Sequence, residues 1–151
     1  MGGADDGLIG VVRLAFPPEP RLLGTVRLVV GIVARKAGID EEAIEDLKVA
    51  ASETCAVAIG DLARSASVTP IELDLIERKD GFGVEVRDRA PEVARWERAS
   101  PEVDTEVDDR QLGMALIGAL VDDLQSEELL GGGHRTSFWV RRPPPAQPAR
   151  G

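Results

Sequence analysis

DEEAIEDLKVAASETCAVAIGDLAR, residues 40–64, predicts one long helix. Asp40 is a good N-cap residue, and Glu41 and Glu42 lie in the first turn, where negative charge is favourable. We therefore expect a helix that ends near residue 64 and buries one face in the core. The apolar side chains recur along the segment at helical spacing: Ile44, Leu47, Ala51, Cys55, Ala58 and Leu62.

The segment before this helix predicts a strand and a further helix. LIGVVRLAF (8–16) is rich in β-formers and ends at a run of prolines, which indicates a strand. PRLLGTVRLVVGIVARKAG (20–38) has Pro20 near its first turn and Gly38 at the position of a C-terminal cap. Its apolar residues make two lines, one through Val26 and Val30 and one through Val29 and Ile32. Such a helix fits either a thick core element or a surface that binds another chain.

The segment after the long helix predicts a β-hairpin, a loop, a helix and a last strand. PIELDLIE (70–77) alternates Ile71, Leu73 and Leu75 inward with Glu72, Asp74 and Glu77 outward. RKDG supplies a turn, and FGVEVRD (82–88) alternates again. Residues 90–110 are polar and acidic and predict a long loop. LGMALIGALVDDLQ (112–125) predicts a helix with apolar positions at Leu112, Ala115, Leu116, Ala119 and Val121, and GGGHRTSFWVRR (131–142) predicts a glycine turn and a strand.

The order β-α-α-β-β-α-β predicts an α+β protein, a two-layer α/β sandwich with a mixed, mostly antiparallel sheet. The domain is expected over residues 8–142. Residues 1–7 are expected to be a flexible N-terminus, and residues 143–151 a disordered Pro-rich tail.

Composition and charge argue against several classes of partner and cellular location. The net charge of −9, with 27 acidic residues, disfavours direct binding of nucleic acid, and 3% aromatic residues disfavours base stacking. No apolar run is long enough to cross a membrane, and MGGADDG is unlike a signal peptide, so we expect a cytoplasmic protein. A lone Cys55 excludes a disulfide framework, and His134 has no second His or Cys beside it, so no metal site is expected.

This order of elements, with certain residues at its joints, resembles the GHKL ATPase domain (Bergerat fold). More narrowly, it resembles the anti-sigma-factor serine kinases of bacterial partner-switching systems. The similarity covers roughly residues 10–142. It is most specific over the first helix and the start of the second, where Gly38, Ile39-Asp40, the acidic helix start and Ser-Glu-x-Cys (52–55) follow one another at the spacing of the family. It is carried by PRLLGTVRLVVGIVARKAGIDEEAIEDLKVAASETC, VEVRDRAP, RQLGMALIGALVDDL and GGGHRTSFWV.

The resemblance implies partners and cofactors. Members of that family sequester a sigma factor from RNA polymerase, and they bind an anti-anti-sigma (STAS-domain) protein and phosphorylate it on serine with ATP and magnesium. They typically work as homodimers. In the family a Glu of the second helix is the general base, and an Asn four residues on binds Mg²⁺. Glu53 holds the first position, whereas Val57, which offers no lone pair, holds the second. An ordinary solvated helix glutamate is the alternative for Glu53.

The other nucleotide motifs of the family are also altered. In DRAPE, Asp88 stands where the family accepts the adenine amino group, but Ala90 and Glu92 replace two glycines. A turn residue at a strand end is the alternative for Asp88.

Two further positions complete the comparison. In QLGM, Gly113 remains where backbone N–H groups at a helix start hold phosphates, and Gln111 replaces the first glycine. After the triple glycine Gly131–Gly133, Thr136 stands where the family supports adenine. A plain strand residue is the alternative for Thr136.

These substitutions predict an anti-sigma factor that still binds its sigma factor but whose nucleotide binding and kinase activity are weakened or lost. The alternative is an active ATP-dependent serine kinase that uses a different Mg²⁺ ligand. A third possibility is a degenerate domain that serves only as a dimer scaffold.

Overall fold

The structure is a computed structural model that describes residues 7–90 and 104–142, with side chains described only from residue 111 in the second range. The expectations for the N-terminus before residue 7, for most of the 90–110 loop including Glu92, and for the 143–151 tail lie outside the described residues. Within the described part of the chain, no helix is long and apolar enough to cross a membrane.

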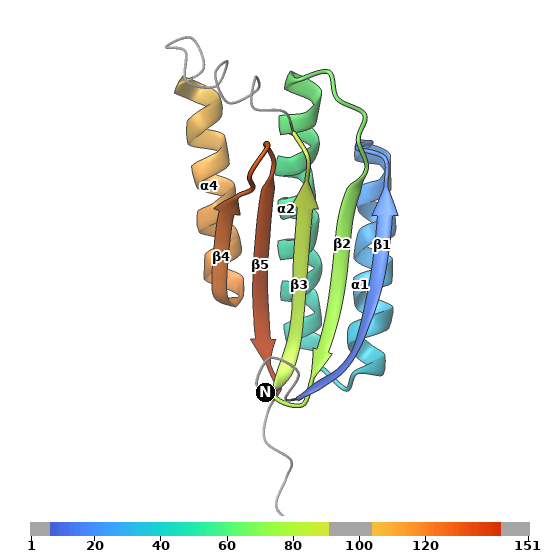
Figure 1. The fold of residues 1–151 in the computed structure, drawn as a ribbon. Helices are drawn as coiled ribbons and strands as arrows, with labels where there is room; N and C mark the ends of the chain where they lie inside the picture. The colour runs from blue at the N-terminus through green and yellow to red at the C-terminus, as the bar shows by residue number, and fades with distance from the viewer. Residues whose placement is uncertain (1–6, 91–103, 143–151) are drawn as a thin grey trace, which may run out of the picture.

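Five strands form one sheet in the order β1-β2-β3-β5-β4 (Figure 1). All four pairings are antiparallel, where the sequence predicted a mixed, mostly antiparallel sheet. The hairpin of β2 and β3 is confirmed. Strand β5 pairs with β3 and brings into register residues that lie between 46 (Asp88 and His134) and 60 (Gly81 and Arg141) positions apart in the chain. The strands are β1 (Leu8–Phe16), β2 (Ile71–Arg78), β3 (Gly81–Asp88), β4 (Asp122–Glu128) and β5 (His134–Arg141).

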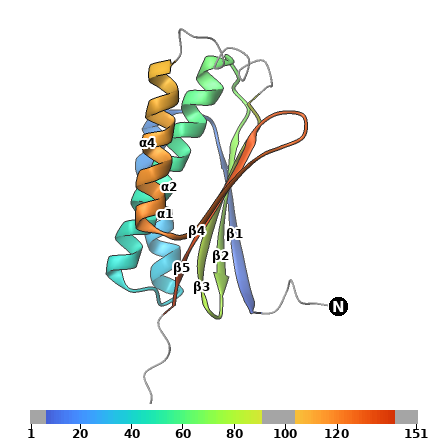
Figure 2. The same cartoon turned by 90° about the vertical axis from the view of Figure 1, so that its left-hand side faces the viewer.

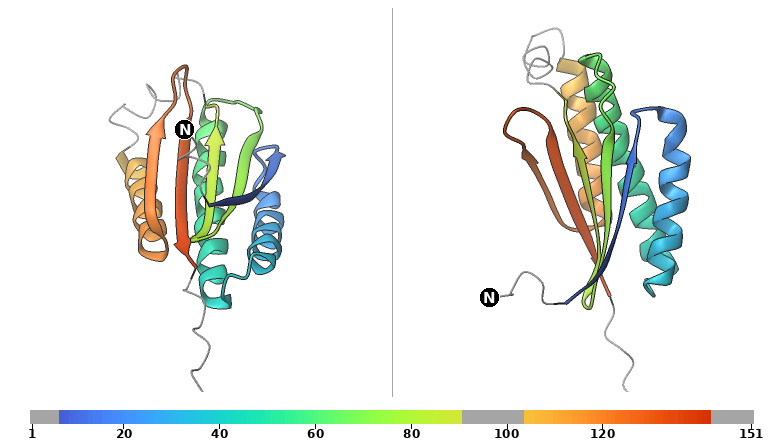
Figure 3. Two further views of the ribbon diagram at one scale, coloured as in Figure 1. Left: turned by 60° about the horizontal axis from the view of Figure 1, so that its bottom comes forward. Right: turned by 45° about the vertical axis from the view of Figure 1, so that its right-hand side comes forward.

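The helices α1 (Leu23–Lys36), α2 (Glu41–Arg64) and α4 (Asp104–Leu120) cover one face of this sheet (Figures 2 and 3). A short 3-10 turn, Pro20–Leu22, leads into α1. Asp40 caps α2 as predicted, since its side chain accepts a hydrogen bond from the backbone N–H of Ala43 at 2.8 Å. The two-layer α+β sandwich is therefore confirmed.

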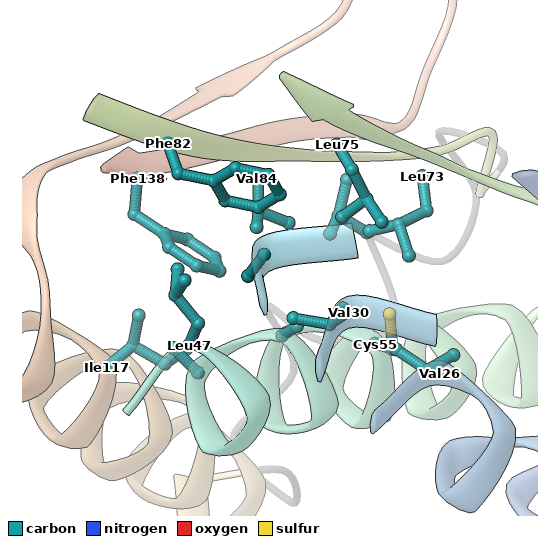
Figure 4. Close-up of a cluster of buried hydrophobic side chains, with 14 of the residues drawn as sticks. Val26, Val30, Leu47, Cys55, Leu73, Leu75, Phe82, Val84, Ile117 and Phe138 are labelled. Atoms are coloured by element: carbon teal, nitrogen blue, oxygen red, sulfur yellow. The ribbon is translucent and has the colours of Figure 1, made fainter. Parts of the chain in front are cut away.

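The core lies between the helical layer and the inner face of the sheet (Figure 4). The whole predicted stripe of α2 is buried, from Ile44 to Leu62. It meets the inward side chains of β2, β3 and β5, among them Leu73, Phe82 and Phe138. Burial raises the pKa of the Cys55 thiol to about 12, so this side chain behaves as a small apolar core residue.

The prediction for residues 112–125 is wrong at both ends. The helix begins earlier, at Asp104, and ends at Leu120, and residues from Asp122 onward form the edge strand β4. Strand β4 was missed because its sequence, DDLQSEE, has no alternation of apolar residues. It is an edge strand in which only Leu124 packs against the core.

The buried face of α4 also differs from the expected one. Leu112 and Leu116 are exposed, at 70% and 45%, and Ala115 and Ala119 are exposed as well. The helix instead packs through Gly113 and Ile117, which is fully buried. The apolar residues of α4 run almost all round the helix, so periodicity alone did not select the face.

Asp74 points to the outer face as predicted, yet it is only 4% exposed. Arg13 of β1 donates to its Oδ1 at 2.8 Å, and Arg87 of β3 donates to its Oδ2 at 3.1 Å. Burial raises the pKa of Asp74, but the hydrogen bonds from Arg13 and Arg87 outweigh that effect, so the pKa lies below its usual value. The ion pairs therefore join the three strands of this half of the sheet.

Replacing Asp74 by Asn is expected to lower the free energy of unfolding by about 2–3 kcal/mol at neutral pH, because the group that accepts three hydrogen bonds from Arg13 and Arg87 loses its charge and one acceptor oxygen. A depressed folded-state pKa stabilises the fold above the unfolded-state pKa of about 3.9, and this stabilisation disappears as the pH falls through the folded value. Urea unfolding of both proteins should therefore show a gap that narrows below about pH 4. Glu42→Gln is the control, because Glu42 is exposed at the start of α2 and lies outside this ion-pair network. A gap that stays constant with pH would contradict the prediction.

Candidate functional site

One face of α2 carries a row of three residues spaced by four, which places them on successive turns: Glu53, Val57 and Asp61. Glu53 and Val57 are half-buried, whereas Asp61 is only 1% exposed. The apolar stripe on the neighbouring face is fixed in the core, and its burial determines the direction in which this row points.

Gly113 of α4 lies against the first two members of this row. A Cβ placed on Gly113 would lie 3.7 Å from Val57 Cγ2 and 3.8 Å from Glu53 Oε1, which is ordinary contact distance. The structure therefore brings Gly113 against Glu53 and Val57, which precede it by 60 and 56 residues in the chain. The predicted position of the magnesium ligand is occupied by a methyl group that faces α4.

The prediction that QLGM opens a helix is wrong. Because α4 begins at Asp104, Gln111 and Gly113 lie well inside it. Backbone N–H groups beyond the first turn bond to carbonyl groups of the helix itself, so they do not point at a ligand. Gln111 is a good helix former, and a single glycine does not end a helix. Gly113 therefore offers close helix packing here rather than a helix start.

Asp88 ends β3 and is 4% exposed. Its Oδ1 accepts a hydrogen bond from the backbone N–H of Ala90 at 3.0 Å, which is the turn geometry that the alternative interpretation described. Ala90 does not adopt a positive φ, so its Cβ is tolerated at this position.

Thr136 lies in β5 and is 6% exposed. Its hydroxyl lies 3.2 Å from the Ser126 hydroxyl of β4. Along β5, His134, Thr136 and Phe138 alternate with more exposed residues, so these three share the face that the helices cover. Thr136 pairs with Val86 and so lies two residue pairs from Asp88 in the β3–β5 register, on the same face of the sheet as His134.

Two residues that sequence reasoning did not place in a site lie beside Asp88. His134 Nδ1 is 3.6 Å from Asp88 Oδ2 and 3.8 Å from Asp61 Oδ2. Asp61 continues the spacing of Glu53 and Val57, and that signal was available in the sequence. His134 was judged by its neighbours in sequence, whereas its neighbours in space come from α2 and β3.

The described residues do not fit a magnesium–nucleotide complex of the family type. Val57 has no lone pair for a metal, α4 continues through the position of the phosphate loop, and Asp88 faces His134. Glu53, the predicted general base, is the one member of the predicted pair on α2 that keeps the residue type of the family motif.

Comparison with known proteins agrees with this fold. The chain is 27% identical to the serine-protein kinase RsbW of Bacillus licheniformis over 125 residues, which is 75% of each chain. It is 25% identical to that of Bacillus subtilis over 129 residues (80% of this chain and 79% of the relative). It is 28% identical to that of Listeria monocytogenes over 121 residues (76% and 77%).

A family model described as the histidine kinase-like ATPase domain matches residues 16–139. That span runs from the end of β1 to within two residues of the end of β5 and so includes every helix and the full hairpin. The chain therefore belongs to the family of histidine kinase-like ATPase domains.

Proposed function

We propose that the protein is an anti-sigma factor that binds and sequesters an RNA polymerase sigma factor in the cytoplasm. An anti-anti-sigma protein of the STAS type releases the sigma factor by competing for the anti-sigma factor. Nucleotide binding and kinase activity are weakened or lost. The similarity to serine-protein kinases named RsbW supports a regulator of this class. Valine at position 57, in place of a magnesium ligand, supports the loss of kinase activity.

Val57 is the observation that carries this proposal. It lies between Glu53 and Asp61 on α2, where a metal ligand is required, and its side chain packs toward Gly113 of α4. A phosphoryl-transfer site relies on the metal to neutralise the charge that develops on the phosphate oxygens. Without that metal ligand, Glu53 could still accept a proton from a serine hydroxyl, but no magnesium ion would activate the phosphate for transfer.

A regulator of this kind needs only different affinities for two partners, and that requires no chemistry. The exposed face of α1 supplies an apolar surface for such binding, because Leu28 is 62% exposed and Ile32 is 46% exposed. Two exposed apolar side chains one turn apart fit the anchors of a helix-mediated interface. We assign this face to the sigma factor or to a second copy of the chain in a homodimer.

An active serine kinase is the second candidate. Glu53 favours it, since this carboxylate is half-buried beside Gly113 and holds the position of the general base. Such a kinase would need a magnesium ligand other than residue 57.

The first test is capture of the partners. The tagged full chain, expressed in its native cell, is expected to recover a sigma factor that mass spectrometry identifies. The purified chain should then prevent that sigma factor from binding core RNA polymerase. Recovery of an anti-anti-sigma protein without any sigma factor, or no effect on the polymerase, would contradict the proposal.

The second test is calorimetric titration with ATP and ADP, with and without magnesium. We expect no magnesium-dependent binding tighter than about 1 mM, because the metal ligand is missing. The matched variant is Val57→Asn, which restores the amide oxygen at that position. Magnesium-dependent binding by the unaltered chain, together with serine phosphorylation that Glu53→Ala abolishes, would establish the kinase instead.

The third test concerns the α1 surface. Leu28→Asp combined with Ile32→Asp is expected to weaken binding of the captured sigma factor, or the dimer, by about 100-fold, because two anchors are lost. Light scattering and a binding titration separate the two interactions. Val68→Asp is the control, since Val68 is 85% exposed in the loop between α2 and β2. Unchanged sigma binding and unchanged mass would show that α1 forms neither interface.

A further inference from the structure

Three potential ligand side chains from three separate elements meet at one end of the sandwich. Asp61 comes from the last turns of α2, Asp88 from the end of β3 and His134 from the start of β5. One ligand atom of each lies within 4.8 Å of the other two. All three residues are buried, with exposures of 1%, 4% and 8%.

Both carboxylates turn one oxygen toward the imidazole. Arg64 donates to Asp61 Oδ1 at 2.8 Å, and the N–H of Ala90 donates to Asp88 Oδ1 at 3.0 Å. The Oδ2 atoms then lie 3.8 Å and 3.6 Å from His134 Nδ1. Hydrogen bonds that hold the second oxygen of a carboxylate are the usual way in which proteins orient metal ligands.

His134 Nδ1 is buried and has no hydrogen-bond partner. The distances to the two carboxylates are too long for hydrogen bonds. Nδ1 lies between the Oδ2 atoms of the two carboxylates. An orphaned nitrogen at the centre of the cluster is therefore an observation separate from the acidic pair, and it points to a ligand that accepts electron pairs.

We propose that Asp61, Asp88 and His134 form a binding site for Zn²⁺. In a tetrahedral zinc site with bonds of about 2.0–2.1 Å, neighbouring ligand atoms are about 3.3–3.4 Å apart. The two measured separations exceed this by only a few tenths of an ångström. Two carboxylates and one histidine also balance the charge of the ion. Mg²⁺ suits the site less well, because it demands octahedral oxygen coordination and retains several waters.

The backbone around the cluster holds the ligands in place. Asp88 and His134 face each other in the register of β3 and β5. Gly133, with a φ of +99°, lets the chain approach closely, because a Cβ there would lie 2.2 Å from the Asp88 carbonyl oxygen. A bound ion would thus tie α2 to the two central strands and stabilise the domain. The inference rests on these distances and stands apart from the loss of kinase activity proposed above.

The experiment uses the full chain without a histidine tag, stripped of metal and titrated with Zn²⁺ against a chromophoric chelator. We expect one bound ion per chain and a raised melting temperature. His134 is the one histidine of the chain, so its imidazole ¹⁵N resonances report directly on coordination at Nδ1. Cobalt substitution should give the visible absorption of a four-coordinate ion.

Three variants decide the assignment. His134→Ala and Asp61→Asn should each weaken Zn²⁺ binding by about 100-fold or more. Asp88→Asn should do the same while retaining an oxygen that can accept from Ala90, so it tests the site if another variant fails to fold. Glu45→Gln, which alters an exposed carboxylate paired with Lys48, is the control and should bind normally. Absence of a stoichiometric ion, unchanged histidine resonances on addition of Zn²⁺, or binding that survives His134→Ala and Asp88→Asn would overturn the proposal.

Discussion

Burial of one stripe of α2 is the constraint on which the rest of the structure depends. The stripe from Ile44 to Leu62 lies against the sheet without solvent exposure over most of its length. A helix of 24 residues held in this way cannot rotate about its axis without exposing several core residues at once. The rotational position of α2 therefore fixes where the row Glu53, Val57 and Asp61 points. The assignments made for these three residues all depend on that direction.

Much of the fold could be predicted because its signals are local. The N-cap Asp40, the α2 stripe and the alternation of β2 and β3 each lie within one segment, and each is present in the structure. Strand β4 gave no such signal, because a polar edge strand buries little and is defined by its pairing with β5. The start of α4 was misplaced because residues 90–110 are polar, acidic and interrupted by proline, a composition that favours a loop, whereas the helix already begins at Asp104.

The candidate site shows the same division between local and long-range information. Glu53 and Val57 could be paired from their spacing on one helix. The cluster of Asp61, Asp88 and His134 could not, since its members come from α2, β3 and β5 and meet only through the strand order. His134 has no ligand nearby in sequence, and its neighbours became evident only when β5 was placed beside β3. A cluster of potential ligands is therefore not evident from the sequence when its residues are distant in the chain and none of them belongs to a recognisable motif.

Val57 lies at the border of the core rather than inside it, which explains why the fold tolerates valine at this position. Val57 is half-buried and faces Gly113 across the contact between α2 and α4. An amide at that position would lose water on one side and would need a metal or a hydrogen-bond partner to offset the loss. Valine needs neither, so α4 can pack closely against α2 with no ion between them. Valine in place of a metal ligand therefore costs the domain little stability, and a protein that acts by binding alone, as proposed above, would be free to keep that change.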